Sequence, residues 1–139
     1  MTKEKKAIQR QAKEILKKII MTKYVKVQLF VPKSHINKVR LALGTAGIGK
    51  MGNYDHTAFV SEGRGYFRPL AGSNPTIGKL GKIEEVSELK LEFVCLKSEI
   101  EKVKEIIKLT HPYEEVALDI LTLTDLPSIK TKRKIGFKP

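Results

Sequence analysis

Cysteine is almost absent from this sequence of 139 residues, since Cys95 stands alone and no intramolecular disulfide can form. Long apolar runs are absent too, because none approaches the roughly eighteen residues that identify a membrane-spanning helix. Lysines interrupt the apolar residues near the N-terminus every few positions, whereas a secretory signal needs an unbroken apolar stretch. We therefore expect a cytoplasmic protein.

Recognisable catalytic and cofactor motifs are also missing. No spacing of Cys and His resembles a zinc site, and Gly63-x-Gly65 lacks the further glycine or lysine of a dinucleotide-binding or phosphate-binding loop. No Ser-His-Asp constellation is visible. These absences favour a non-enzymatic protein, and its cofactor is unknown. A chain of 139 residues has room for a single domain.

The net charge of +12 is concentrated at the two ends of the chain. Residues 1–40 carry 12 basic against 2 acidic side chains, residues 41–123 carry 10 against 12, and residues 124–139 carry 5 against 1. The ends and the nearly neutral middle need separate interpretations, because net charge informs about partners rather than about fold. We divide the chain into a basic helix over 1–22, a domain over 23–123 and a basic tail over 124–139.

The first twenty residues have the pattern of a basic amphipathic helix that Thr2 could cap. Lysines and Arg10 fill the faces that its apolar stripe leaves free. We expect the stripe to pack on the domain or on a neighbouring subunit, ahead of a role in binding nucleic acid or an anionic membrane. The stripe consists of Ile8, Ala12, Ile15, Leu16, Ile19 and Ile20.

The middle of the chain predicts two β-α-β units separated by an insertion. Alternating apolar residues predict strands over Tyr24–Val31, Thr57–Ser61, Ser87–Leu96 and Val116–Leu123. Helices are expected over His35–Leu43, capped by Ser34, and over Glu99–Leu109. Four glycines, at positions 44, 47, 49 and 52, are expected to end the first of these helices, and a Gly/Pro-punctuated stretch follows from Glu62 to Lys82.

The two units repeat in sequence. Lys33–Val39 matches Lys97–Val103 at five of seven positions, and Asn53–Phe59 aligns with Pro112–Leu118. A repeated split β-α-β unit predicts an α+β, ferredoxin-like sandwich with both helices on one face of an antiparallel sheet. The other face would be open, and oligomerisation is the usual way to cover it.

Nine of the ten glycines lie between positions 44 and 81. Backbone amides around Gly63 and Gly65, together with Arg64 and Arg68, could hold an anion such as a phosphate. Asn53, Tyr54 and Asn74 complete this set of candidate ligand-binding residues. The alternative is that the glycines only satisfy turns in a long hairpin.

Two histidines stand at turns before predicted strands, beside carboxylates. His56 and His111, with Glu115, could hold a divalent metal ion if both turns converge. We favour the alternative that these are surface turns. Tyr54 and Tyr113 match across the repeat and are expected to pack with satisfied hydroxyls, while Cys95 is expected to be a small buried residue.

Four motifs in this order resemble one known domain. They are Gly52-Asn53-Tyr54-Asp55-His56-Thr57-Ala58-Phe59, Gly63-x-Gly65-x-Phe67-x-Pro69, Gly72-x-Asn74-Pro75-x-Ile77-Gly78 and His111-Pro112-Tyr113-Glu114-Glu115. The domain is the insertion domain of the NIF-three-like (YqfO/YbgI) family, which also occurs as a free-standing small protein. The resemblance covers about 24–123.

The resemblance implies a fold similar to the CutA and PII signalling proteins, which assemble as trimers and bind effectors through a long loop between central strands. That loop would correspond to about Glu62–Glu85 here. Full-length family members carry a two-metal centre on flanking domains and are labelled cyclohydrolase-like. None of those metal-ligand motifs is found in this chain, so the resemblance does not bring the hydrolase activity with it.

We expect a PII/CutA-like homo-oligomer, a trimer or else a dimer, that binds a small ligand, a metal ion or a protein partner through its Gly-rich region in a regulatory or accessory role. The alternative is nucleic-acid binding by the basic ends, through Lys13 and Lys17 of the helix and Lys132 and Arg133 of the tail. A metal-dependent hydrolase is the third hypothesis and ranks lowest.

Overall fold

The computed structural model describes residues 1–20, 23–124 and 128–131, with 18–20 as backbone only. The elements follow in the order α1 (Lys3–Ile20), β1 (Tyr24–Val31), α2 (Ile36–Thr45), β2 (Phe59–Phe67), β3 (Glu84–Leu96), a 3-10 turn (Lys97–Glu99), α3 (Ile100–Thr110) and β4 (Leu118–Thr122). Apart from the 3-10 turn, their types and order are those that the sequence predicts.

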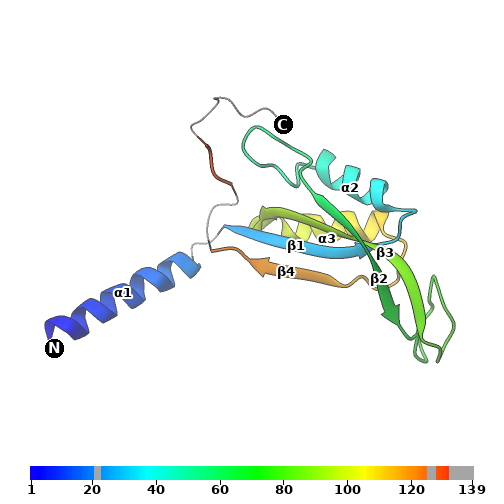
Figure 1. Cartoon of the computed structure of the whole chain (residues 1–139), viewed down its shortest axis with the longest axis horizontal. Coiled ribbons are helices and arrows are strands. Elements are labelled where there is room, and N and C mark those ends of the chain that lie inside the picture. Colours follow the sequence, from blue (N-terminus) through cyan, green and yellow to red (C-terminus); the bar gives the residue numbers. More distant parts are fainter. Residues whose placement is uncertain (21–22, 125–127, 132–139) are drawn as a thin grey trace.

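The four strands form one antiparallel sheet in the order β2-β3-β1-β4. α2 and α3 pack side by side on one face of this sheet, and the other face carries no helix (Figure 1). This is the ferredoxin-like arrangement, so the predicted fold class is confirmed.

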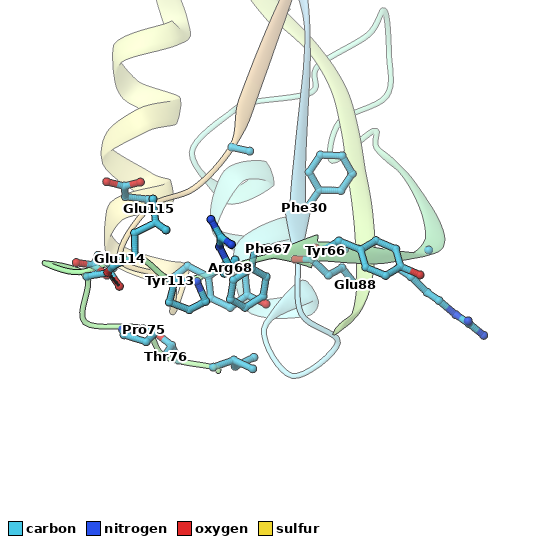
Figure 2. Close-up of a pocket in the computed structure, with 18 of the residues that line it drawn as sticks. Phe30, Tyr66, Phe67, Arg68, Pro75, Thr76, Glu88, Tyr113, Glu114 and Glu115 are labelled. Atoms are coloured by element: carbon cyan, nitrogen blue, oxygen red, sulfur yellow. Dashed lines mark hydrogen bonds between the residues drawn. The ribbon is translucent and has the colours of Figure 1, made fainter. Parts of the chain in front are cut away.

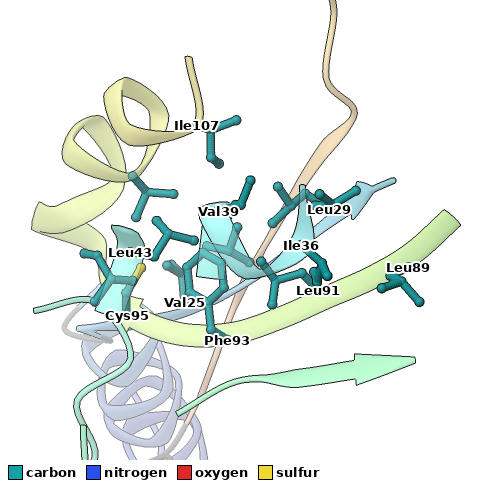
Figure 3. Close-up of a cluster of buried hydrophobic side chains, with 14 residues drawn as sticks. Val25, Leu29, Ile36, Val39, Leu43, Leu89, Leu91, Phe93, Cys95 and Ile107 are labelled. Atoms are coloured by element: carbon teal, nitrogen blue, oxygen red, sulfur yellow. The ribbon is translucent and has the colours of Figure 1, made fainter. Parts of the chain in front are cut away.

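The hydrophobic core fills the layer between the sheet and the two helices (Figure 3). Successive side chains of a strand point to opposite faces, so the alternation of β1 sends its valines and Leu29 into the core and Lys26, Gln28 and Phe30 to the open face. Cys95 lies in this core as predicted, and burial, with a smaller effect of the Glu99 carboxylate, raises the pKa of its thiol to about 11.

The β2–β3 hairpin extends beyond the rest of the sheet. β1 ends where Val31 pairs with Leu89, so the first part of β3, from Glu84 to Glu88, pairs only with β2. The loop that joins the two strands is therefore 68–83, shorter than the predicted 62–82, because residues 62–67 continue β2.

Helix ends differ in detail from the predictions. Thr2 caps α1 as expected, since its Oγ1 accepts a hydrogen bond from the Lys5 amide at 3.1 Å. Ser34 does not cap α2; His35 holds the N-cap position, and the Ser34 hydroxyl bonds to its ring at 2.7 Å. Gly44 lies inside α2 instead of ending it, whereas Gly47, Gly49 and Gly52 adopt positive φ in the loop that follows.

α1 does not pack on its own domain. Every side chain of the helix from Lys3 to Lys17 is exposed, and the helix extends away from the sheet (Figure 1). The prediction that the apolar stripe packs on the domain is therefore wrong for these residues, and packing on another molecule is left open. None of the described helices has both the length and the apolar character that crossing a membrane requires.

Candidate functional site

A pocket of about 970 Å³ lies at the end of the sheet where β1 finishes and β4 starts. Its floor is the open face of the sheet, at Phe30 of β1 and Lys90 of β3. The β2–β3 hairpin and the following residues up to Ile77 form one wall. The turn after α3, from Tyr113 to Ala117, forms the other.

Aromatic side chains form part of the pocket lining. Figure 2 shows Phe67, Arg68 and Tyr113 close to one another, with Phe30 on the strand beyond them and the Tyr66 ring pointing to the other side of β2. Rings of this kind bind flat apolar groups well, because they lose little conformational entropy on binding.

Two arginines of the predicted anion site have different surroundings. The Arg64 guanidinium pairs across the hairpin with the Glu85 carboxylate at 3.0 Å. Arg68 has no ion pair with any described residue, although it lines the pocket. Lys90 is paired with Glu92 at 3.4 Å, so among the described residues that line the pocket Arg68 is the cation without an ion pair.

The glycines that suggested an anion-binding loop lie within β2. Gly63 and Gly65 are strand residues opposite Glu88 and Val86, and neither has a positive φ. A β-carbon at Gly65 would overlap the Glu88 carboxylate, whereas one at Gly63 would meet no atom within 4 Å. Because Gly65 has no β-carbon, the Glu88 carboxylate can lie against β2, inside the pocket.

Tyr113 faces this carboxylate. Its hydroxyl oxygen is buried and has no hydrogen-bond partner among the described residues, which contradicts the expectation of a satisfied hydroxyl. Burial, and then the nearby negative charge of Glu88, raise the pKa of Tyr113. Tyr54, its counterpart in the repeat, is 76% exposed, so the two tyrosines do not have equivalent roles.

His111 holds the turn that carries Tyr113. Its ring Nε2 lies 2.7 Å from the Phe30 carbonyl oxygen at the end of β1, and its Nδ1 accepts a hydrogen bond from the Tyr113 amide at 3.2 Å. These partners define a neutral ring with the proton on Nε2. The ring is buried and packs edge-on against Tyr113, with 4.9 Å between ring centroids.

The same turn also holds the loop after β2. The Asn74 amide donates to both carboxylate oxygens of Glu114, at 3.0 and 3.3 Å, and the Thr76 hydroxyl donates to the Pro112 carbonyl at 2.9 Å. Asn74, a predicted ligand-binding residue, thus joins the two walls of the pocket through its backbone.

Asn53 and Tyr54, the other predicted ligand-binding residues, do not line the pocket. They lie exposed in a turn closed by two hydrogen bonds between Met51 and Tyr54, at 2.8 and 2.9 Å. The structure therefore gathers Arg64 and Arg68 at the pocket, brings Asn74 beside it and leaves this pair outside.

The candidate metal ligands do not come together. His56 pairs with Asp55 at 3.1 Å and has its ring against Gly44 of α2, while His111 is bonded to β1 and its own turn. Glu115 lines the pocket. Over residues 1–20, 23–124 and 128–131 there is no group of three His, Cys, Asp or Glu side chains that could hold a metal ion.

Of the candidate nucleic-acid residues, Lys13 and Lys17 lie exposed on α1. Lys132 and Arg133 lie outside the described residues.

Phe30 and Glu88 are among the pocket residues that sequence reasoning missed. Phe30 is an aromatic residue at an open-face position of β1, between Gln28 and the end of the strand, and this break in the alternation was the available signal. Glu88 precedes the apolar part of β3, and its register partner is Gly63. Its side chain finds room in the pocket because Gly65, two residues further along β2, has no β-carbon, which the sequence does not reveal.

Solved structures with this arrangement define the class of fold. CutA from Pyrococcus horikoshii matches with a TM-score of 0.56 at 24% identity over 73% of this chain and 85% of its own. CutA from Synechococcus elongatus matches with a TM-score of 0.57 at 13% identity over 74% and 79%. The chain has a CutA-like fold.

Relatives in sequence give the particular family. A Bacillus cereus protein related to NIF3 matches with a TM-score of 0.66 at 41% identity, over 75% of this chain and 26% of its own. The GTP cyclohydrolase 1 type 2 homolog of Bacillus subtilis is 45% identical over 80% of this chain, and that of Halalkalibacterium halodurans is 40% identical over 89%. This chain is a NIF3-like domain, as its motifs indicate.

The chain spans only about a third of the length of these two GTP cyclohydrolase 1 type 2 homologs, 30% and 33%. No protein-family model matches it.

Proposed function

We propose that this NIF3-like domain is a non-catalytic, CutA-like module that binds a small anionic ligand with a flat apolar group in the pocket beneath the β2–β3 hairpin, in a regulatory or accessory role. The observation that carries the proposal is Arg68, which has no ion-pair partner among the described residues and lies among aromatic side chains. An unpaired guanidinium in such a pocket is suited to a carboxylate or phosphate.

The cyclohydrolase name belongs to longer relatives, and we do not extend it to this chain. A hydrolase that uses a metal ion needs a cluster of ligands, and the described residues offer none. The pocket, in contrast, offers volume, rings and, among the described residues that line it, one cation without an ion pair, which are the features of a binding site.

The proposal includes assembly with further copies of the chain. The open face of the sheet carries exposed apolar residues, among them Phe59 of β2 and Leu121 of β4, and both edge strands are free to pair in the described chain. Covering such a face and its edges with a second and third copy is the solution that CutA-like folds suggest.

Ligand binding is tested with the full chain by titrating ATP, AMP, inorganic phosphate and MnCl₂ and following amide shifts by NMR. We expect a nucleoside phosphate to shift residues 67–77 and 113–117. Arg68→Gln should weaken binding at least about tenfold, the loss of one charge-assisted hydrogen-bonded contact. Arg64→Gln is the matched control, because Arg64 is already engaged by Glu85, and it should change affinity less than about threefold.

Shifts confined to the Asn53–His56 turn, or equal losses in both arginine variants, would contradict this assignment of the pocket. Binding of Mn²⁺ alone at His56 or His111 would replace it with a metal-binding role.

A further inference from the structure

No residue of α1 lines the pocket, and the helix has two distinct faces. One face is apolar and exposed from Ile8 onward: Ile8, Ile15 and Leu16 are 59%, 56% and 55% exposed, and Ala12 lies between them on the helix surface, with Lys5 on the same face one turn before Ile8. Leaving these side chains in water forgoes the free energy of burying them, so this face is suited to a partner with an apolar interior.

The other face is basic. Five cations follow the spacing three, four, three, four along the helix, which aligns them in one stripe; they are Lys3, Lys6, Arg10, Lys13 and Lys17. With 100° per residue the stripe lies opposite Ile8 and Ile15, and it is about 21 Å long at 1.5 Å per residue. Lys13 stands at the border between the two faces.

Charge decides between the possible partners of this helix. α1 carries seven Lys and Arg against Glu4 and Glu14, so a second copy of the helix would be repelled. A nucleic acid would satisfy the cations but would leave the isoleucines in water. An anionic lipid surface satisfies both faces, because apolar side chains enter the boundary of the acyl chains while lysines reach the headgroup phosphates.

We propose that α1 is a membrane-surface anchor that lies in the plane of an anionic lipid bilayer, with Ile8, Ile15 and Leu16 buried below the headgroups. The geometry of the sheet adds an orientation. The Leu123 amide donates to the Tyr24 carbonyl at 3.1 Å, so the start of β1 and the end of β4 lie side by side, at the end of the sheet opposite the pocket. α1 leaves the domain from that end (Figure 1), so the pocket lies at the end of the domain remote from the proposed anchor.

The test is co-sedimentation of the full chain with vesicles of phosphatidylcholine alone and of phosphatidylcholine with phosphatidylglycerol. We expect partitioning onto the anionic vesicles only, reduced by 0.5 M NaCl because the attraction of the cations is screened. Ile8→Ser/Ile15→Ser should lower the partition coefficient at least about tenfold, since two apolar side chains no longer enter the bilayer.

The matched control is Leu41→Ser/Leu109→Ser, which removes two exposed leucines from α2 and α3 and should change partitioning less than about twofold. All four positions are exposed, so the variants test surface binding without disturbing the core, and a thermal melt checks this.

Four results would overturn the inference. The first is a full chain that does not bind anionic vesicles, and the second is equal binding by Ile8→Ser/Ile15→Ser. The third is tight binding to duplex DNA or RNA that Lys13→Gln/Lys17→Gln abolishes and the serine variant leaves unchanged, which would assign α1 to nucleic acid. A fall in solution mass of the serine variant, without vesicle binding by the parent, would assign the stripe to another copy of the chain.

Discussion

Gly65 and Gly63 look alike in sequence but have different surroundings in β2. The Glu88 carboxylate occupies the space where a side chain at Gly65 would begin, and Gly63 faces open space. Gly65→Ala should displace Glu88, a flexible side chain, and so weaken the charge that helps to raise the pKa of Tyr113. We expect that pKa to move part of the way down towards its ordinary value of about 10.

The pKa of Tyr113 can be followed by NMR with tyrosine labelled at the ring carbon that bears the hydroxyl. Gly63→Ala is the control: it should leave this pKa where it is and stabilise the fold by about 0.4–1 kcal/mol, because alanine loses less backbone entropy on folding. If Gly65→Ala also left the titration of Tyr113 unchanged, Glu88 would not act on this phenol.

His111 makes stability depend on pH. Burial lowers its pKa, against the opposing effect of the Phe30 carbonyl, and the positive charge of His35 adds to the lowering while Glu88 counters it. A protonated ring would also direct an N–H at the Tyr113 amide, which now donates to Nδ1. The folded state therefore binds fewer protons than the unfolded state just below pH 6.5.

It follows that the contribution of His111 is complete above about pH 6.5 and falls as the pH is lowered to the folded-state pKa, by about 1.4 kcal/mol per unit of difference. Urea unfolding at pH 7.5, 6.5 and 5.5 measures this slope. His111→Gln should be less stable at pH 7.5 and should flatten the slope in this range. An unchanged slope in that variant would show that other groups cause the pH dependence.

At the scale of elements, the sequence predicts best where one face of a strand is buried. Alternation identifies β1 and most of β3, because every second residue enters the core. The same pattern predicts that β2 ends at Ser61, although the strand runs to Phe67. The glycines and Arg64 in this segment are typical of a loop, and they form a strand only because they pair with β3. The pocket was not predicted for the same reason, because residues 62–67 of β2, which the sequence assigns to a loop, form part of one of its walls.

The turn after α3 and the loop after β2 act as one element through Glu114. Glu114→Ala removes the acceptor of the Asn74 amide and should free the loop 68–83, at a small cost in global stability because the contact is exposed. Glu115→Ala is the matched control, because Glu115 is also exposed and has no such contact with a described residue. Trypsin should cut after Lys79 and Lys82 several times faster in Glu114→Ala than in Glu115→Ala or the parent; equal rates would show that this hydrogen bond does not restrain the loop.

At the scale of the whole molecule, the open face of the sheet has polar residues at its centre, which bond to one another, and apolar residues at its edges. Glu92 is only 16% exposed there, because it accepts a hydrogen bond from Gln28 at 2.8 Å and pairs with Lys90 at 3.4 Å. Phe59 at one edge is 66% exposed and Leu121 at the other 49%. A face whose half-buried carboxylate already has its partners can be covered by another copy without leaving that charge unpaired.

Assembly through this face predicts that one substitution at its margin separates the subunits. We expect light scattering of the full chain to give the mass of a trimer, and Phe59→Lys to give a smaller species, because a lysine would have to be buried without a partner. Leu41→Lys, at an exposed position of α2 on the far side of the sheet, should keep the parent mass. A monomeric parent, or a Phe59→Lys variant with the mass of the parent, would remove the open face as the interface and leave the pocket as the site of a single chain.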